Sequence, residues 1–383
     1  MHMLNLATLN LASAAVQTNL GGWFHDLSPF LVKFTPTFGI RYYGLSYALG
    51  FTFAYLFLRF LSRRNATLIP YDRIGDAMMY LIVGTLVGGR LFYVIGYEPS
   101  LLIDFSSSAP WWGVLAINNG GMASHGGIIG CALAAWRISR GFKDHTGKIV
   151  GRCSPLHVFD MAVLIAPFGL FFGRMANFIN GELLGKIVAN PGQHAPWWAV
   201  RYPQEITTLA DSQLAQTPEQ MNQIMQLSMM HMLPNEQDWF QGYYRMLDLI
   251  QRGDDGLKAQ LEPLIAARYP TQLLQASLDG LLVLAVVWII AMKPRKPGLI
   301  AGAFAITYAL GRIPMDFIRL PDAGVSQFGP LTRGQTYSAI TLLVGIVLVV
   351  YAMRSPADKL GGWRKSSKAA NKGGATQSLR KVK

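Results

Sequence analysis

Charged side chains are scarce in this chain of 383 residues, and their scarcity limits the classes of protein that it can form. Asp, Glu, Lys and Arg make up 14% of the residues, whereas 51% are hydrophobic. Soluble domains carry roughly 25% charged residues, so the composition argues against a soluble enzyme. It predicts an all-α polytopic membrane protein.

Cysteine is also nearly absent, because Cys131 and Cys153 are the two in the chain. Their positions, one in an apolar run and one in a basic loop, fit neither a metal site nor a disulfide framework. We therefore expect no metal and no cofactor. The first residues, MHMLNLATLNLASAAV, contain an apolar run that no Lys or Arg precedes, unlike a signal peptide. They predict a retained segment at the membrane interface.

Seven segments are long and apolar enough to span a bilayer. They are residues 40–61, 75–97, 121–140, 157–179, 271–292, 298–318 and 335–353. With the N-terminus outside, 20 of the 34 Lys and Arg residues fall in inner loops and the C-terminal tail, ten fall outside and four within spans. Cytoplasmic loops collect basic residues, so this distribution predicts an outer N-terminus and a cytoplasmic C-terminus.

The same pattern divides the chain into five regions. They are an extracytoplasmic interfacial segment (1–39), spans one to four with the catalytic motifs (40–186), an extracytoplasmic subdomain (187–268), spans five to seven (269–353) and a basic disordered cytoplasmic tail (354–383). The net charge of +13 then follows mostly from topology, and the tail predicts attraction to anionic lipid rather than nucleic-acid binding. In the outer subdomain we expect Met and Trp side chains, including Trp197, Trp198 and Trp239, to pack in its own core, with lipid or client contact as the alternative.

One stretch, GRMANFINGELLGK from Gly173, places several polar residues at the end of an apolar span. Arg174 keeps its proton, and an unpaired arginine at mid-bilayer costs about 2.5 to 3.5 kcal/mol even on insertion scales. Arg174 and Asn177 are three apart and share a helical face. The stretch therefore predicts a polar cavity with an anionic partner, although a polar helix end that snorkels to the interface is the alternative.

The sixth predicted span carries a second polar stripe. It consists of Tyr308, Arg312, Asp316 and Arg319, at spacings that align them on one helical face, with Pro314 expected to kink the helix. An internal Arg312–Asp316 ion pair is the structural alternative. Counted together with Arg174 and a third arginine at the outer rim, however, the arginines outnumber their one nearby acid. A lipid phosphate would supply the missing anion, because the planar guanidinium donates two parallel hydrogen bonds to phosphate.

Two smaller clusters accompany these stretches. Tyr43 stands at the entrance of the first span, where a tyrosine can also be a simple interfacial anchor. His125 lies among glycines in the third span, where it can be a satisfied interhelical histidine. Gly126 and Gly130 have the spacing that suits close helix packing, or close approach of a lipid head group to the backbone.

Taken together, these stretches resemble the prolipoprotein diacylglyceryl transferases of bacteria. The resemblance covers about 40–353 and is carried by Tyr43-Gly44, GGRLFYV from Gly88, GGMASHGGIIG from Gly120, GRMANFINGELLGK from Gly173, YPTQLLQ from Tyr269 and GRIPMDFIRLPDA from Gly311. It implies transfer of the diacylglyceryl group of phosphatidylglycerol to the lipobox cysteine thiol of a preprolipoprotein, releasing glycerol phosphate. It also implies a multi-pass protein of the bacterial plasma (inner) membrane, with phosphatidylglycerol, other membrane lipids and preprolipoprotein signal peptides as partners.

Carried over residue by residue, the resemblance implies roles for most members of the clusters. The catalytic set is Tyr43, His125, Arg174 and Arg312. The substrate-binding set is Asn177, Asn180, Glu182, Gly185, Tyr308, Asp316 and Arg319. His125 is the base in the clusters with a pKa near neutrality, so it either relays the thiol proton or orients the lipid. Glu182 either pairs with the arginines or positions the incoming cysteine.

The chain also departs from the family pattern. Asp316 stands where Glu is usual, Lys186 where Arg is usual, and YPTQLLQ replaces HPSQLYE, which puts Tyr269, Leu274 and Gln275 at the positions of His, Tyr and Glu. A divergent paralogue, a lipid or anion transporter such as a flippase, and a pure lipid-binding protein are the alternatives. An inverted repeat would favour a transporter, but GRMANFINGE has no counterpart in the other half of the chain.

Overall fold

The computed structural model describes residues 20–34, 39–107, 109–116, 120–321 and 332–364, without the side chains of Ser124, His125 and Arg333. The chain forms two compact units. The helical unit comprises the described residues of Tyr43–Met175, Leu274–Asp316 and Ser326–Lys383. The mixed unit comprises those of Met1–Tyr42, Ala176–Leu273 and Phe317–Val325. The two are described separately below.

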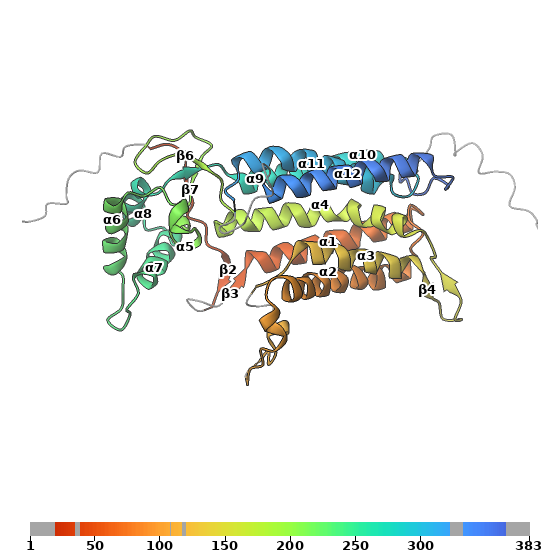
Figure 1. Cartoon of the computed structure of the whole chain (residues 1–383), viewed down its shortest axis with the longest axis horizontal. Coiled ribbons are helices and arrows are strands. Elements are labelled where there is room, and N and C mark those ends of the chain that lie inside the picture. Colours follow the sequence, from red (N-terminus) through yellow and green to blue (C-terminus); the bar gives the residue numbers. More distant parts are fainter. Residues whose placement is uncertain (1–19, 35–38, 108, 117–119, 322–331, 365–383) are drawn as a thin grey trace, which may run out of the picture. The chain divides into compact units, whose positions relative to one another are not determined.

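Each of the seven apolar segments forms a helix in the structure (Figure 1). The helices are α1 (Tyr42–Arg63), α2 (Ile74–Gly96), α3 (Ser124–Ser139), α4 (Pro155–Asn180), a fifth formed by α9 (Thr271–Gln275), η7 (Ala276–Leu282) and α10 (Val283–Ala291), then α11 (Leu299–Ile318) and α12 (Arg333–Arg354). Within the described ranges, five of them are long and apolar enough to cross a membrane. The all-α polytopic class is confirmed. The number of spans and the orientation of the termini stay predictions.

The third and sixth segments are the two that fall short. Helix α3 has 16 residues, because Gly120 and Gly121 adopt φ angles of +84° and +80° that end any earlier helical start. Helix α11 has 20 residues, but it carries Arg312 and Asp316 and continues through Pro314. The polar stripe that marks it as a candidate site is therefore also what lowers its apolar character.

Glycines hold α2 and α3 together. A methyl group built on Gly84 would lie 2.6 Å from the carbonyl oxygen of Gly130, and one built on Gly88 would lie 2.9 Å from the Gly130 Cα. A methyl on Gly126 would likewise collide with the backbone of Gly88. This arrangement is the close packing that small residues four apart permit in a membrane. Of the two interpretations of Gly126 and Gly130, helix packing is therefore the one that the contacts support.

A buried acid caps α11. Asp160 of α4 is 2% exposed, and its carboxylate oxygens accept hydrogen bonds from the backbone N–H groups of Gly298 and Ala301, both at 2.8 Å. The first donor is on the residue before α11 and the second is in its first turn, where N–H groups have no partner within the helix. Asp160 therefore fixes α4 to the start of α11.

Short elements connect the long helices of the helical unit. They are η1 (Tyr71–Arg73), η2 (Pro99–Leu102), η3 (Gly113–Leu115) and the hairpin of β4 (Phe142–Lys143) and β5 (Ile149–Val150). Part of the segment predicted as a disordered tail is ordered, because the Trp363 ring lies 5.7 Å from that of Phe57 and 6.2 Å from that of Trp288. Residues 365–383 lie outside the described residues, so the prediction for them stays a prediction.

The mixed unit is built on a small sheet with the strand order β1-β7-β8-β6. Its strands are β1 (Trp23–Phe24), β7 (Val200–Arg201), β8 (Ala267–Arg268) and β6 (Ile187–Ala189), with a separate hairpin of β2 (Phe30–Lys33) and β3 (Gly39–Arg41). Strand β1 is parallel to β7, while β8 is antiparallel to both β7 and β6. Residues that precede α1 thus join the fold of the segment between α4 and α9.

Helices complete the mixed unit. They are α5 (Glu205–Thr208), α6 (Pro218–Met229), α7 (Trp239–Gln251) and α8 (Asp255–Leu261), with the short turns η5 (Asp211–Gln213) and η6 (Glu262–Leu264). Helix α6 begins with a capping box, in which Thr217 accepts from the backbone of Gln220 and the Gln220 side chain accepts from the backbone of Thr217. The core that these helices enclose includes Phe24, Ile224, Tyr243, Met246 and Leu261.

The prediction that Met and Trp side chains form this core is correct in part. Met246 is fully buried, and Trp239 packs against the core. Trp197, in contrast, is 87% exposed, and Trp198 stacks on Tyr269 with ring centroids 5.2 Å apart. Trp197 and Trp198 therefore lie on the surface of the unit and not in the core that was expected for them.

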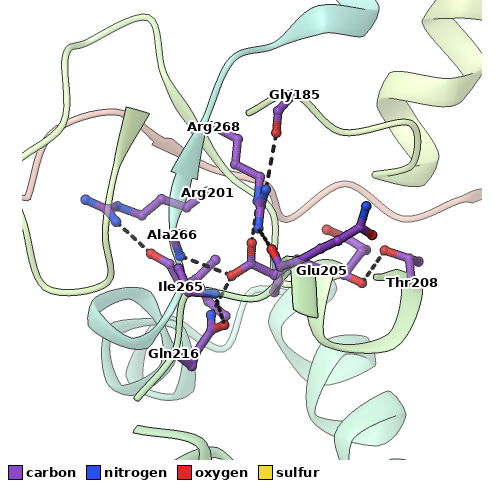
Figure 2. A network of polar contacts seen from close by, with 12 residues as sticks. Gly185, Arg201, Glu205, Thr208, Gln216, Ile265, Ala266 and Arg268 are labelled. Atoms are coloured by element: carbon purple, nitrogen blue, oxygen red, sulfur yellow. Dashed lines mark hydrogen bonds and ion pairs between the residues drawn. The ribbon is translucent and has the colours of Figure 1, made fainter. Parts of the chain in front are cut away.

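A buried ion pair joins strand β8 to helix α5. Figure 2 shows the Glu205 carboxylate between Arg268 and the segment Ile265–Ala266. Its Oε2 accepts from Arg268 Nε at 2.6 Å, and its Oε1 accepts from Gln216 Nε2 at 2.5 Å and from the Ala266 N–H at 3.1 Å. Both partners of the ion pair are fully buried. Every carboxylate oxygen thus faces a donor, as burial of a charge requires.

Candidate active site

In the helical unit, Arg174 and Arg312 lie close enough to Asp279 and Tyr308 to interact electrostatically with both. Arg174 lies on α4 and Arg312 on α11, 138 positions later in the chain. Both interact electrostatically with the carboxylate of Asp279 and with the hydroxyl of Tyr308. The structure therefore brings together three residues of the predicted site, Arg174, Arg312 and Tyr308, within one unit.

Asp316 belongs to the same cluster. Its Oδ1 lies 3.6 Å from Arg312 Nε, so the internal ion pair considered for this helix is present. The Nη1 atom of Arg312 is buried and has no hydrogen-bond partner among the residues that the structure describes. The ion pair therefore leaves the Nη1 group of the Arg312 guanidinium available for a further acceptor.

Asp279 is the member of this cluster that sequence reasoning missed. It lies in η7, the π-helical part of the fifth span, and is fully buried. With Asp279 included, Arg174 and Arg312 face two acids, so the expected count of one nearby acid was one too few. The signal in the sequence was a single Asp within the apolar segment 271–292, where any ionisable residue is unusual.

Tyr43 is the second residue of α1 and is half-buried. Its ring stacks on that of Tyr47 one helical turn later, with centroids 6.5 Å apart. Nothing in this contact separates a catalytic tyrosine from an interfacial one, and its assignment stays a prediction.

The backbone of His125 lies in the first turn of α3, and its side chain is outside what the structure describes. The approach to that turn is organised by Arg90 of α2, which is 5% exposed. Its guanidinium donates hydrogen bonds of 2.6 to 2.8 Å to the carbonyl oxygens of Gly113, Val114, Gly120 and Gly121. A buried cation that is fully engaged by backbone carbonyls has a structural role, and here it shapes the segment that precedes His125.

In the mixed unit, Asn177 and Glu182 form a pair at the end of α4. Gly181, with a φ of +64°, ends the helix in the left-handed conformation. The Asn177 Nδ2 group donates to Glu182 Oε1 at 2.6 Å, and the Glu182 backbone carbonyl accepts from Gln272 Nε2 at 2.6 Å. Burial raises the pKa of Glu182, and the positive charge of Arg41 opposes the rise.

Asn180 and Gly185 show two different environments. The Oδ1 atom of Asn180 is buried without a hydrogen-bond partner among the described residues. Gly185 is closely packed instead, because a methyl group built on it would collide with the carbonyl oxygen of Tyr269 and lie 2.7 Å from Tyr269 Cβ. The Gly185 carbonyl oxygen accepts from Arg268 Nη1 at 3.2 Å. Close packing is therefore sufficient to explain why position 185 is a glycine.

Arg319 is tied to this segment through its backbone. Gly185 and Arg319 form an isolated antiparallel bridge. On either side of it, the Lys186 N–H donates to the Ile318 oxygen at 2.8 Å and the Leu320 N–H donates to the Leu184 oxygen at 3.1 Å. The segments that follow α4 and α11 thus pair along three residues. Lys186, one of the departures from the family pattern, contributes through its backbone here.

The chain is similar to known proteins over most of its length. The family model described as prolipoprotein diacylglyceryl transferase matches residues 29–351. Three similar proteins carry the name phosphatidylglycerol–prolipoprotein diacylglyceryl transferase. That of Bdellovibrio bacteriovorus is 37% identical over 355 residues, which cover 89% of this chain and 97% of the relative. That of Stenotrophomonas maltophilia is 32% identical, with 87% and 95% covered, and that of Rhodospirillum rubrum is 31% identical, with 89% and 98% covered.

Proposed function

Because this chain belongs to the prolipoprotein diacylglyceryl transferase family, we propose that it transfers the diacylglyceryl group of phosphatidylglycerol to the lipobox cysteine of a preprolipoprotein. The acceptor sulfur forms a bond to the glyceryl carbon, and the bond from that carbon to the phosphate oxygen breaks. Glycerol phosphate leaves with the electron pair, and the thiol proton passes to a base or to the leaving phosphate. The product is a thioether.

The observation that carries this proposal is the convergence of Arg174 and Arg312 on Asp279 and Tyr308. Two guanidinium groups from distant segments of the chain meet in one cluster with Asp279 and Asp316, where a phosphate can compete with the carboxylates for hydrogen bonds from both arginines. As the glyceryl carbon–oxygen bond breaks, charge grows on the phosphate, and the arginines stabilise it. Removal of one such donor typically lowers the rate about a hundredfold to a thousandfold.

The remaining predicted residues have supporting roles in the proposal. A free thiol with a pKa near 8.5 is only about 3% ionised at pH 7, so the client cysteine needs a base or a positive field. His125 is proposed to accept or relay its proton, with Tyr43 beside the reacting groups. Substrate binding is assigned to Asn177, Asn180, Glu182, Gly185, Tyr308, Asp316 and Arg319.

The chain's own cysteines are poor candidates for the acceptor thiol. Burial raises the pKa of Cys153 to about 11, which leaves very little thiolate near neutral pH. Cys131 lies within α3, among the apolar helices. The acceptor is therefore placed on a client protein, and we place the reaction at the outer face of the bacterial inner membrane.

The purified protein in phosphatidylglycerol vesicles, incubated with a lipobox peptide, tests the proposal. The peptide should gain the mass of one diacylglyceryl group, and the same peptide with serine in place of its cysteine should gain nothing. Arg174→Ala and Arg312→Ala should each suppress the gain about a hundredfold or more. An intact peptide after prolonged incubation with folded wild-type protein would reject the enzyme in favour of a binding protein or transporter.

A further inference from the structure

Asp279 is a buried carboxylate for which the reaction described above has no role. It is 0% exposed, and neither of its oxygens has a hydrogen-bond partner among the described residues. A carboxylate without such partners is costly even in a protein interior, and an acid within a membrane span is more costly still. The amide nitrogen of Gln275, four positions earlier, is also buried without a partner within those residues.

Local backbone structure directs Asp279 toward the arginines. Residues Ala276–Leu282 form a π-helical segment, a feature that occurs often at functional sites. Gly280 packs directly on α4, since a methyl group built there would lie 2.7 Å from Phe171 Cβ. On the side of α11, Asp279 Oδ1 lies 3.9 Å from the position of a Cβ built on Gly311. The Asp279 carboxylate therefore lies against α11 at Gly311, the residue before Arg312.

The charges of this cluster balance. By formal charge, Arg174 and Arg312 carry two positive charges, and the neighbouring acids Asp279 and Asp316 carry two negative ones. Asp316 is held by Arg312 at 3.6 Å, whereas Asp279 is not fixed by any hydrogen bond to the described residues. A phosphate entering this cluster must compete with an acid, and Asp279 is the less constrained of the two.

We propose that Asp279 is a positioning residue that balances the charge of Arg174 and Arg312 and weakens their hold on phosphate, so that glycerol phosphate can leave after transfer. This inference rests on the proposed function for its consequence in turnover. Two arginines alone would bind the product, a phosphate monoester with more negative charge than the lipid, more tightly than the substrate. The Asp279 carboxylate repels the product more strongly than it repels the lipid substrate, because the product carries the larger negative charge.

Asp279→Asn tests the proposal, because the amide keeps the shape and removes the charge. We expect its affinity for glycerol phosphate, measured by calorimetry on the purified protein, to rise about tenfold, the effect of one unit charge several ångströms away in a partly screened site. In the transfer assay, KM for phosphatidylglycerol and kcat should both fall. Damage to the fold would instead raise KM or leave it unchanged.

Two further variants complete the test. Asp279→Glu restores the charge and should bring the affinity for glycerol phosphate back toward the wild-type value. Glu98→Gln changes the net charge equally at an exposed residue, and should leave that affinity as it is. Unchanged product affinity in Asp279→Asn would overturn the proposal, and so would a lower melting temperature or a failure to fold, which would assign the carboxylate to stability. If wild-type protein transfers nothing but Asp279→Asn binds glycerol phosphate more tightly, the proposed function fails and the charge competition stands.

Discussion

Replacement of Glu205 by glutamine should strongly destabilise the mixed unit. Glu205 and Arg268 are both fully buried, and their closest atoms are 2.6 Å apart. Every oxygen of the carboxylate accepts a hydrogen bond, from Arg268, Gln216 or Ala266. An amide in either orientation would point its NH2 group at one of these donors. Glu205→Gln therefore removes the charge that balances Arg268 and also creates a donor–donor conflict.

The expected loss follows from the burial of the pair. Breaking a buried ion pair by removing one partner costs about 3 to 5 kcal/mol. Domains have a total stability of about 5 to 15 kcal/mol, so the variant should lose a large share of it. Arg268 also donates to the Gly185 carbonyl, and its release should loosen the segment that follows α4. Transfer activity should fall with stability.

Hydrogen exchange of peptides from the sheet, together with thermal unfolding, measures the loss. Glu236→Gln is the matched control, because Glu236 pairs with Arg245 at 2.5 Å but the side chains are 12% and 34% exposed. Water screens this partly exposed pair, so its contribution should lie closer to the ~0 to 1 kcal/mol of exposed pairs than to that of the buried pair. Replacing both members of the buried pair, with glutamine at 205 and methionine at 268, should recover part of the loss. If Glu205→Gln is no more destabilising than Glu236→Gln, the reasoning is refuted.

Three further outcomes follow from the structure. Arg90→Lys should make residues 113–116 and 120–121 more sensitive to proteolysis and lower transfer activity, because an ammonium cannot reach all of the carbonyls that Arg90 contacts. Each lost bond to a charged group costs about 1.5 to 3 kcal/mol. Equal protease resistance would contradict this. Gly130→Ala should cost about 1 to 3 kcal/mol of stability through overpacking against Gly84 and so lower the melting temperature, whereas Gly75→Ala, in open space, should leave it unchanged. Burial lowers the pKa of His25, so the unfolded chain binds a proton near pH 6.5 that the folded unit takes up only at lower pH. The stability of the mixed unit should fall as the pH drops below about 6.5, by at most about 1.4 kcal/mol per pH unit, and His25→Asn should remove that slope.

The helices of this protein were predictable because apolar length is a property of the sequence. Helix α1 covers Tyr42–Arg63 where residues 40–61 were expected, and α4 covers Pro155–Asn180 where 157–179 were expected. The start of α3 was not predictable from hydropathy, because it depends on the positive φ angles of Gly120 and Gly121. Strands of two or three residues, such as β7, are too short to show a periodic pattern.

The candidate site was predictable for residues that interrupt an apolar helix in a group. Arg312 and Asp316 drew attention because they are aligned on one helix, and Arg174 because it has polar neighbours. Asp279 was missed because it stands alone in an apolar segment, and its significance depends on a π-helical turn that no sequence pattern indicated. The ion pair of Glu205 and Arg268 was missed because its members are 63 positions apart.

The pairing of strands β6 and β8 has a consequence for how such a protein can change over evolution. Strands β6 and β8 pair at Ile187 and Arg268, so the two ends of the segment between α4 and α9 lie side by side. Exposed turns between these two strands, such as residues 233–235, can change in length while β7, Glu205 and the pairing of Gly185 with Arg319 stay in place. The exposed turns of the mixed unit can therefore vary in size and surface while the backbone pairing beside the candidate site keeps its geometry.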